Sequence, residues 1–278
     1  MTGSDSATSP VWPFDIGIVG IGIVGTHQLT REAEAVIRRC KRTFVIADGY
    51  GIPEYLATLC PEITDLATLY EPGRNRGPTY YKMAAEVVAA AVSDAPVCLA
   101  TYGHPWVYCY PTTLINQAAP LVGLRVEVFP GISAFDTLLV DLGTDIAADG
   151  IQMYEATDVL IRQRPIQSDV ACVIWQPTVA GDPTCPSKPY PAAQFEPLQN
   201  YLLQFYPDDH EASLVTSKTH PLMRSVVKHL RLGELAATLA GDPDVGTLYI
   251  PALSQRPIAD AALMEFMTTA GMDAPSPS

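Results

Sequence analysis

Basic residues are scarce in this sequence of 278 residues, where 17 lysines and arginines stand against 30 aspartates and glutamates. The formal net charge of −13 argues against a nucleic-acid-binding protein, because that class carries a basic face. No apolar run approaches the length that spans a membrane, and residues 1–12 lack the basic start of a signal peptide. We therefore expect a soluble, cytoplasmic protein that binds neither nucleic acid nor a membrane.

The sequence has 6 cysteines but no Cys-x-x-Cys pair, and most of the cysteines lie in apolar surroundings. This pattern is typical of structural thiols in a reducing compartment, and we predict no metal site. Apolar residues make up 48% of the chain, which predicts a buried core and argues against a disordered protein.

Strands and helices are predicted to alternate in the first half of the chain. Segments with helical spacing of apolar residues separate the β-rich runs at 14–20, 43–47, 95–100 and 124–129. Alternation at this spacing predicts a parallel sheet built from βαβ units. We therefore expect an N-terminal α/β domain at residues 14–130.

The pattern changes after residue 134. Helical segments and a loop rich in proline and glycine join the strand-like runs at 152–156, 169–176, 212–216 and 247–251. These features predict a second α/β domain with a mixed sheet, at residues 131–251.

Four segments are predicted to lie outside these sheets. Residues 66–80 have the composition of a loop, and a helix is expected to follow at 81–92. Residues 1–13 and 252–278 are expected to be flexible or peripheral tails. The weakly amphipathic patch at 258–267 is expected to pack on the second domain.

Two loops with glycine follow predicted strands. Tyr102-Gly103-His104-Pro105 comes after the run 95–100, at the strand end where ligands bind in open α/β sheets. Gly20, Gly22 and Gly25 follow the first strand in the spacing G-x-G-x-x-G. That spacing fits a dinucleotide site with Asp48 on the ribose, and it fits a tight turn equally well, so both alternatives stay open at this point.

The order of three loops resembles the tetrapyrrole methylase superfamily. These are Val19–Gly22 with Leu29-Thr30, then Tyr102–Pro105, then Pro130–Ala134, and the resemblance covers roughly residues 15–251. It implies a two-domain α/β fold with a mainly parallel N-terminal sheet and a mixed C-terminal sheet. It also implies S-adenosylmethionine in a cleft between the domains, which displaces the dinucleotide alternative.

A narrower resemblance is to the borosin peptide backbone α-N-methyltransferases. His104 stands where an aspartate is usual in corrin and porphyrin methylases, and Arg76 is followed by the run Thr79–Met83, as in the borosin family. The run Tyr154–Pro165 is also similar to that family. Its structural alternative is an amphipathic helix with solvated arginines.

The borosin resemblance implies roles for individual residues. Cofactor contacts are implied for Gly22, Tyr102, Gly103, His104, Val107, Ser133, Ala134, Gln176, Thr247 and Leu248. Catalytic roles are implied for Tyr70, Arg76, Tyr80 and Tyr102. Fungal members tend to carry a further tyrosine where this sequence has Ala67, which leaves the role of Tyr70 open. Whether Tyr102 is catalytic or only a cofactor contact is open as well.

These residue types suit methylation of a peptide nitrogen. That nitrogen is a poor nucleophile because its lone pair is delocalised into the carbonyl group, so its proton must be removed and the imidate oxygen stabilised. A tyrosine beside an arginine suits proton removal, since a nearby cation favours phenolate. A turn through Gly77-Pro78 is expected to bring Arg76 and Tyr80 together. Tyr102 suits either the imidate oxygen or the sulfonium.

The resemblance also implies a peptide partner. Fungal borosin proteins carry their substrate as a long C-terminal extension, whereas residues 252–278 are short and contain Asp260, Glu265 and Asp273. We therefore expect a split system, in which a homodimer acts on a separate precursor peptide with a leader and a core. A complex of two enzyme and two precursor chains is one such arrangement.

Two alternatives remain. A tetrapyrrole or other small-molecule methyltransferase on the same fold needs a basic cleft, for which the candidates are Arg74, Arg76, Arg162 and Arg164. A cofactor-sensing or leader-peptide-binding module needs no catalytic residue, so that Arg76→Ala and Tyr80→Phe would leave its function unchanged.

Overall fold

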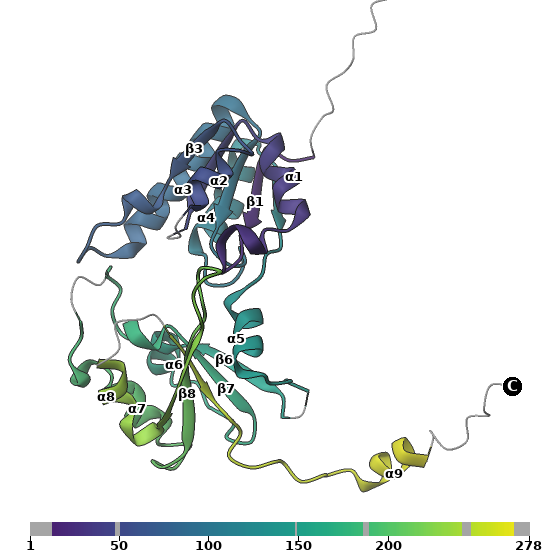
Figure 1. Cartoon of the computed structure of the whole chain (residues 1–278), viewed down its shortest axis with the longest axis vertical. Coiled ribbons are helices and arrows are strands. Elements are labelled where there is room, and N and C mark those ends of the chain that lie inside the picture. The colour runs from purple at the N-terminus through teal and green to yellow at the C-terminus, as the bar shows by residue number, and fades with distance from the viewer. Residues whose placement is uncertain (1–12, 48–50, 148, 186–188, 241–245, 270–278) are drawn as a thin grey trace, which may run out of the picture.

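The structure is a computed structural model that describes residues 13–47, 51–147, 149–185, 189–240 and 246–269 (Figure 1). Two five-stranded sheets organise the chain into an upper and a lower lobe in this view. Asp48, which the dinucleotide alternative placed on a ribose, lies outside the described residues. No helix within the described ranges is long and apolar enough to cross a membrane.

The first sheet consists of parallel strands. They are β1 (Ile16–Gly20), β2 (Arg42–Ile46), β3 (Glu62–Asp65), β4 (Val97–Thr101) and β5 (Val126–Phe129). The order across the sheet is β3-β2-β4-β1-β5, and Ile18 of β1 lies opposite both Leu99 of β4 and Val128 of β5. Because the strands are parallel, their carboxyl ends meet at one edge, which faces the lower lobe in Figure 1.

Helices cover both faces of the first sheet. They are α1 (Arg31–Arg39), α2 (Ile52–Leu56), α3 (Arg76–Asp94) and α4 (Tyr110–Ala118). Successive residues of a strand point to opposite faces. Val19 therefore packs in one buried cluster with Val36 of α1, and Ile18 in another with Met83 of α3.

The second sheet is mixed. Its strands are β6 (Ile151–Glu155), β7 (Ala171–Trp175), β8 (Glu211–Thr216), β9 (Val226–Arg231) and β10 (Thr247–Ile250). Their order is β6-β7-β10-β8-β9, in which β6 and β7 are parallel and the other neighbouring pairs are antiparallel. The predicted α/β fold, with a parallel first sheet and a mixed second sheet, is therefore confirmed.

Helices also cover both faces of the second sheet. α5 (Ala134–Leu142) packs Leu138 against Val173 and Trp175 on one face. On the other face, Phe195 lies in the core formed with α6 (Ala156–Arg162), α7 (Glu196–Leu202) and α8 (Leu235–Ala240). Because α5 is the first element after β5, the chain enters the lower lobe directly after β5.

The prediction of a loop over residues 66–80 is partly wrong, because α3 already begins at Arg76. The Asn75 side chain caps this helix by accepting a hydrogen bond from Gly77 N at 2.8 Å. Pro78 lies in the first helical turn, where a missing N–H costs the helix nothing. Arg76 and Tyr80 are therefore brought together by one turn of helix, not by a turn through Gly77-Pro78.

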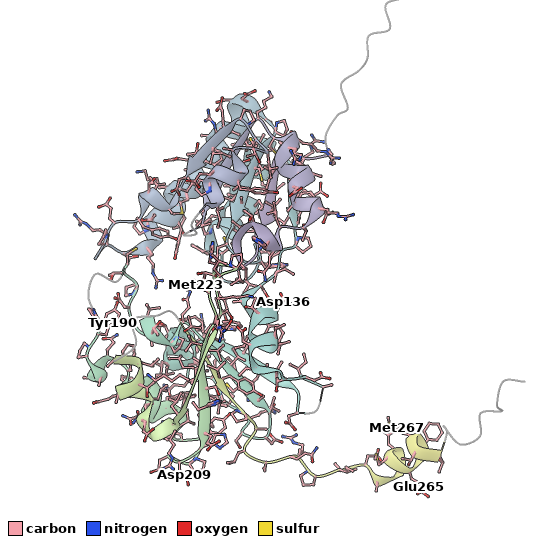
Figure 2. The ribbon with its side chains drawn as sticks, viewed as in Figure 1. Asp136, Tyr190, Asp209, Met223, Glu265 and Met267 are labelled. Carbon is pink, nitrogen blue, oxygen red and sulfur yellow. The ribbon has the colours of Figure 1, made fainter. Side chains whose placement is uncertain are left out.

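The expectation that the patch at 258–267 packs on the second domain is wrong. α9 (Ala261–Thr269) lies away from the second sheet, as Figure 2 shows by the labelled Glu265 and Met267, and Phe266 is 68% exposed. The chain before it is fastened to the lobe, since Leu253 N donates to Ser168 O at 2.7 Å and Arg256 pairs with Asp169. The irregular segment after Arg256 leads to this helix, away from the sheet (Figure 1).

The ion pair between Asp15 and Arg125 joins the starts of β1 and β5 at 3.1 Å. The hydrogen bonds and charge of Arg125 hold the pKa of Asp15 below its usual value. The carboxylate therefore adds stability at a pH above about 4, and that stability is lost as the pH falls through the lowered pKa. We expect Asp15→Asn to lower the free energy of unfolding at neutral pH, by a difference that shrinks in acid.

Denaturant unfolding of both proteins at a series of pH values checks this. Asp94→Asn is the control, because the Lys41–Asp94 pair is solvent-exposed and such pairs contribute little. A deficit in Asp15→Asn that stays constant down to acid pH would contradict the prediction.

Candidate functional site

Three glycines meet where β1, β4 and β5 end. A Cβ atom on Gly20 would lie 2.4 Å from the carbonyl oxygen of Gly103, and a Cβ on Gly131 would lie 2.6 Å from the same oxygen. Real Cβ atoms do not approach an oxygen so closely, so only glycine fits at these two positions. The backbones of the three loops therefore touch directly at the carboxyl edge of the first sheet.

Gly22 belongs to the same group. We call these four glycines, Gly20, Gly22, Gly103 and Gly131, the glycine crossing. Gly103 N donates to Gly22 O at 3.0 Å and Gly22 N donates to Gly103 O at 3.4 Å, and both glycines have positive φ, +77° and +69° respectively. A 3₁₀ turn follows at Gly25–Gln28, and α1 begins only at Arg31. No α-helix start faces these glycines within the described part of this loop, which favours the tight-turn alternative over a pyrophosphate site.

The loop after β4 is shaped by its own hydrogen bonds. Tyr102 N donates to Ile46 O at 2.9 Å, Val107 N donates to His104 O at 2.9 Å, and Trp106 N donates to His104 Nδ1 at 3.1 Å. His104 thus closes a turn through both its carbonyl oxygen and its ring. Partial desolvation raises the pKa of Tyr102, which favours the protonated phenol at neutral pH.

Ser133 and Ala134 lie where the loop after β5 becomes α5. Ser133 is buried and caps the helix, because its Oγ accepts a hydrogen bond from Asp136 N while its own N and Oγ donate to Asp136 Oδ2 at 2.6 and 2.7 Å. The serine therefore has a structural function beside any cofactor contact.

We expect Ser133→Ala to lower the free energy of unfolding by about 1 kcal/mol through loss of this cap. Thr30→Ala is the matched control, because Thr30 Oγ1 caps α1 by the same kind of bond, from Ala33 N at 3.0 Å. If Ser133 also contacts the cofactor, only Ser133→Ala weakens its binding in a calorimetric titration. Equal cofactor affinity in the two variants would leave Ser133 with the capping role alone.

The second lobe supplies the three remaining predicted cofactor contacts. Gln176 follows β7 with a positive φ of 55° and lines the cavity described next. Thr247 begins β10 and is partly exposed. Leu248 is fully buried in the core of the second lobe, opposite Ile174, so its side chain does not reach a ligand at the surface of the lobe.

A cavity of about 760 Å³ lies between the lobes, beside the start of α3. Both lobes contribute residues to its wall, among them Arg76, Tyr80, Tyr108, Cys109, Tyr110, Glu155, Ile161, Gln176, Asp182 and Pro183. Tyrosines form much of this wall, and Tyr108 contacts Trp175 with ring centroids 5.9 Å apart.

Two of the four predicted catalytic residues, Arg76 and Tyr80, lie in this wall. Tyr70 packs edge-on against Tyr80 with ring centroids 6.2 Å apart, and Tyr110 packs on Tyr80 at 6.1 Å. Burial, and then the neighbouring Tyr80, raise the pKa of Tyr70, which keeps this phenol protonated at neutral pH. Tyr102 lies on the loop after β4 and is 41% exposed.

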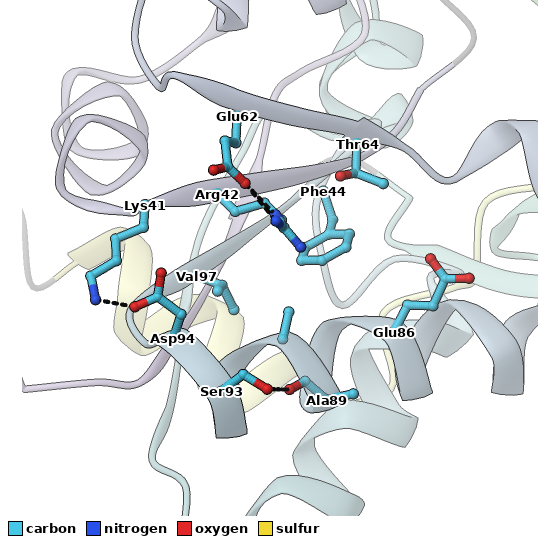
Figure 3. A pocket seen from close by; sticks show the side chains of 11 residues that line it. Lys41, Arg42, Phe44, Glu62, Thr64, Glu86, Ala89, Ser93, Asp94 and Val97 are labelled. Atoms are coloured by element: carbon cyan, nitrogen blue, oxygen red, sulfur yellow. Dashed lines mark hydrogen bonds and ion pairs between the residues drawn. The ribbon is translucent and has the colours of Figure 1, made fainter.

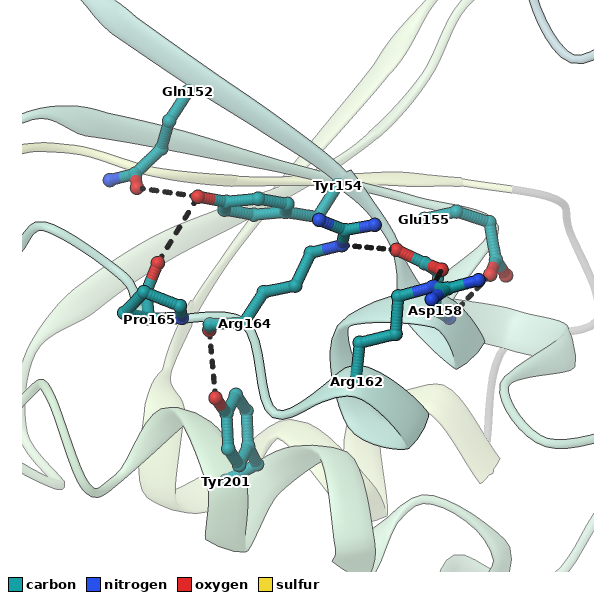
Figure 4. Close-up of polar contacts among 8 residues, drawn as sticks. All are labelled: Gln152, Tyr154, Glu155, Asp158, Arg162, Arg164, Pro165 and Tyr201. Carbon is teal, nitrogen blue, oxygen red and sulfur yellow. Dashed lines mark hydrogen bonds and ion pairs between the residues drawn. The ribbon is translucent and has the colours of Figure 1, made fainter.

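The run Tyr154–Pro165 divides into two parts in the structure. Glu155, Thr157 and Ile161 line the cavity. Arg162 and Arg164 instead pair with Asp158 at the surface, where Arg162 is bonded at 2.6 Å (Figure 4). The alternative of a helix with solvated arginines is therefore correct for the part that contains Arg162 and Arg164.

The charge of the cavity bears on the small-molecule alternative. Of the four arginines that a basic cleft would need, Arg76 lines the cavity, whereas Arg74 is exposed and lies 3.7 Å from Glu71. The described wall also contains the carboxylates Glu155 and Asp182. Such a wall is unfavourable for a substrate with many carboxylates.

A second cavity, of about 450 Å³, lies at the opposite edge of the first sheet (Figure 3). Arg42, Glu62 and Val97, which begin β2, β3 and β4, line it, and Arg42 pairs with Glu62 at 2.5 Å. Ligands of open α/β sheets bind beyond the carboxyl ends of the strands, so this cavity at the amino ends is not the candidate site.

Several residues of the cavity wall were not predicted from the sequence to belong to the site. Tyr108 and Tyr110 directly follow the loop Tyr102–Val107, and this proximity was a usable signal. Glu155 lies in the run Tyr154–Pro165, but no role was assigned to it there. Asp182 carried no signal, since it lies in a loop without periodicity. Among the described residues, no group of three histidine, cysteine, aspartate or glutamate side chains is arranged to hold a metal ion.

A family model described as "Tetrapyrrole (Corrin/Porphyrin) Methylases" matches residues 15–236. Among solved structures, uroporphyrin-III-C-methyltransferase from Thermus thermophilus superposes with a TM-score of 0.61 at 18% identity, covering 85% of this chain and 91% of that one. Diphthine synthase superposes with a TM-score of 0.58 at 16% identity, covering 94% and 96%. At these identities the likeness is one of fold.

Curated relatives combine a methyltransferase with a peptide precursor. A methyltransferase/type I borosin cyclic peptide precursor from Coprinopsis marcescibilis is 30% identical over 239 residues, covering 84% of this chain and 61% of that protein. A methyltransferase/gymnopeptides precursor from Gymnopus fusipes is 28% identical over 239 residues, covering 84% and 56%. The chain thus spans less than two thirds of the length of these relatives.

Proposed function

Because the chain belongs to the tetrapyrrole methylase family and is an S-adenosylmethionine-dependent methyltransferase, we propose that it methylates backbone amide nitrogens of a ribosomally made precursor peptide. The observation that carries this proposal is the pair Arg76 and Tyr80, one helical turn apart in a tyrosine-rich wall with two carboxylates. We further propose that the enzyme is a homodimer and that the precursor is supplied in trans. The relatives named as methyltransferase/precursor fusions support the peptide as substrate.

The glycine crossing fits the cofactor that this family uses. Gly20, Gly22, Gly103 and Gly131 bring backbone, not side chains, to the carboxyl edge of the sheet, and nothing closer than Ile23 Cδ1 at 3.4 Å would meet a Cβ on Gly103. We propose that S-adenosylmethionine lies against this edge, where it supplies an electrophilic methyl group.

Residues of both lobes are proposed to hold the cofactor. They are Gly22, Tyr102, Gly103, His104, Val107, Ser133 and Ala134 from the three loops, with Gln176 and Thr247 from the second lobe. Leu248 is proposed to take part through its backbone, because its side chain is buried.

The residues of the cavity wall are proposed to activate the amide. Tyr80 accepts the amide proton as its phenolate and becomes a neutral phenol, which leaves an imidate. The positive charge of Arg76 stabilises the phenolate before this transfer and the imidate oxygen after it. Tyr70 packs behind Tyr80 and holds its ring. Tyr102, whose phenol stays protonated, is suited to donate a hydrogen bond and not to act as a base.

The proposal is tested by incubating the enzyme with S-adenosylmethionine and the peptide encoded beside its gene. We expect the peptide to gain methyl groups in intact-mass spectra and fragmentation to place them on backbone nitrogens. A methyl ladder on the enzyme itself would overturn the action in trans. Methylation of a tetrapyrrole, with none of the peptide, would overturn the peptide substrate.

A further inference from the structure

A short antiparallel pairing joins the two lobes beside the cavity. Residues 181–185 of the second lobe, here called the strap, run along residues 73–76 at the start of α3. Gly73 N donates to Cys185 O at 2.8 Å, Cys185 N donates to Arg74 O at 3.0 Å, and Arg76 N donates to Pro183 O at 3.0 Å. The strap therefore fixes the backbone of the residue that we place at the centre of the chemistry.

The strap also holds the Arg76 side chain. Arg76 Nη2 donates to the carbonyl oxygen of Asp182 at 2.9 Å, and Nε approaches that of Pro183 at 3.4 Å. These partners are neutral, and no ion pair of Arg76 occurs among the described residues. Hydrogen bonds from a guanidinium to two carbonyl oxygens orient the arginine without a direct ion pair.

The Asp182 carboxylate is directed into the strap itself. Asp182 Oδ1 accepts a hydrogen bond from Thr184 N at 2.7 Å, and Oδ2 accepts one from Thr184 Oγ1 at 3.0 Å and one from the Tyr190 phenol. Burial raises the pKa of Asp182, but the bonds from Tyr190 and Thr184 and the charge of Arg76 outweigh it, and the net pKa is lowered. The carboxylate thus stays ionised and bound at neutral pH.

Tyr190 connects this carboxylate to the core of the second lobe. Its ring packs edge-on against Phe195 with centroids 6.0 Å apart, and Phe195 is buried in that core. Figure 2 places the labelled Tyr190 on the side of the second lobe that faces α3. Burial, together with the bond to Asp182, raises the pKa of Tyr190 to about 12, which keeps the phenol a donor.

We propose that Tyr190 is a positioning residue for methyl transfer: by fixing the Asp182 carboxylate it holds the two carbonyl oxygens that orient Arg76 at the cavity wall. This rests on the proposed function, in which Arg76 acts on the substrate amide. The competing explanation is that the phenol only stabilises the second lobe.

Tyr190→Phe removes the hydroxyl and keeps the ring. We expect kcat for peptide methylation to fall about tenfold, because a small displacement of a catalytic group is costly, while KM for S-adenosylmethionine stays unchanged. Tyr201→Phe is the matched control, since Tyr201 also packs edge-on on a phenylalanine, Phe205, and its hydroxyl also bonds within this lobe, to Arg164 O at 2.7 Å (Figure 4). It is expected to shift the unfolding midpoint similarly and to leave kcat unchanged.

A double-mutant cycle separates positioning from stability. If Tyr190 acts through Arg76, adding Tyr190→Phe to Arg76→Lys causes little further loss of kcat in single-turnover measurements. A further loss of about tenfold in that background, the sign of an independent effect, would overturn the proposal. An unchanged kcat in Tyr190→Phe alone would overturn it as well.

A readout without substrate distinguishes failure of this inference from failure of the proposed function. Amide hydrogen exchange at residues 73–76 is expected to be about tenfold faster in Tyr190→Phe than in wild type, and unchanged in Tyr201→Phe. If wild type methylates no peptide, the proposed function fails while the exchange result still decides whether Tyr190 holds the strap. Unchanged exchange in Tyr190→Phe would contradict the inference whatever the substrate is.

Discussion

Replacing Arg76 with alanine is expected to lower the rate of peptide methylation about 10²- to 10³-fold, the cost typical of losing one group that stabilises developing negative charge. The guanidinium lies in the cavity wall and is held by backbone carbonyl oxygens, so its charge is available to the substrate amide. The affinity of the Arg76→Ala enzyme for S-adenosylmethionine should change little, because the glycine crossing lies on other loops.

Single-turnover rates from intact-mass spectra and a calorimetric titration with S-adenosylmethionine measure the two quantities. Arg74→Ala is the matched control, since Arg74 lies two residues away, is exposed and only approaches Glu71 at 3.7 Å. We expect it to methylate at the wild-type rate. Equal losses in the two variants, or loss of cofactor binding in Arg76→Ala, would argue against a catalytic Arg76.

Gly20→Ala is expected to destabilise the protein by about 3 kcal/mol and to abolish cofactor binding. The new Cβ would meet Gly103 O at 2.4 Å and Gly131 Cα at 2.8 Å, and both are backbone atoms that no side-chain rotation can move. The three loops would have to separate, and the edge at which we place the cofactor would open.

Gly123→Ala is the control for a glycine substitution without crowding. Its Cβ would meet nothing within 4 Å, and only its φ of +79° opposes alanine, at a cost of about 1 kcal/mol. Denaturant unfolding and cofactor titration compare the two variants. If Gly20→Ala binds S-adenosylmethionine as well as Gly123→Ala does, the crossing is not part of the cofactor site.

The parallel sheet was predictable because its inner strands β1, β2 and β4 are buried on both faces, whereas the edge strand β3, which is more exposed, was missed. Val97-Cys98-Leu99-Ala100 is continuously apolar, and such runs between helical segments indicate parallel strands. β9 was missed for the opposite reason, since Val226–Arg231 is largely exposed and shows neither a continuous apolar run nor strict alternation. The start of α3 was missed because Gly77 and Pro78 suggest a turn, although a proline is tolerated in a first helical turn.

The candidate site was predictable only where its residues are close in the sequence. Arg76 and Tyr80 are four residues apart, and both line the cavity. The Asp182 backbone oxygen accepts a hydrogen bond from Arg76 across the lobes, and Tyr190 bonds only to the Asp182 carboxylate. A bond to a backbone oxygen leaves no pattern of residue types in the sequence. Contacts of this kind depend on how the two lobes meet.

The edge strand β9 bears on how two copies of this chain can associate. An edge strand presents unpaired backbone N–H and C=O groups, and two copies could extend each other's sheets through them. Two charged residues of β9, Lys228 and Arg231, are exposed at this edge. Charged side chains on an edge strand oppose pairing with another chain, so we expect β9 to protect the sheet from edge-to-edge aggregation.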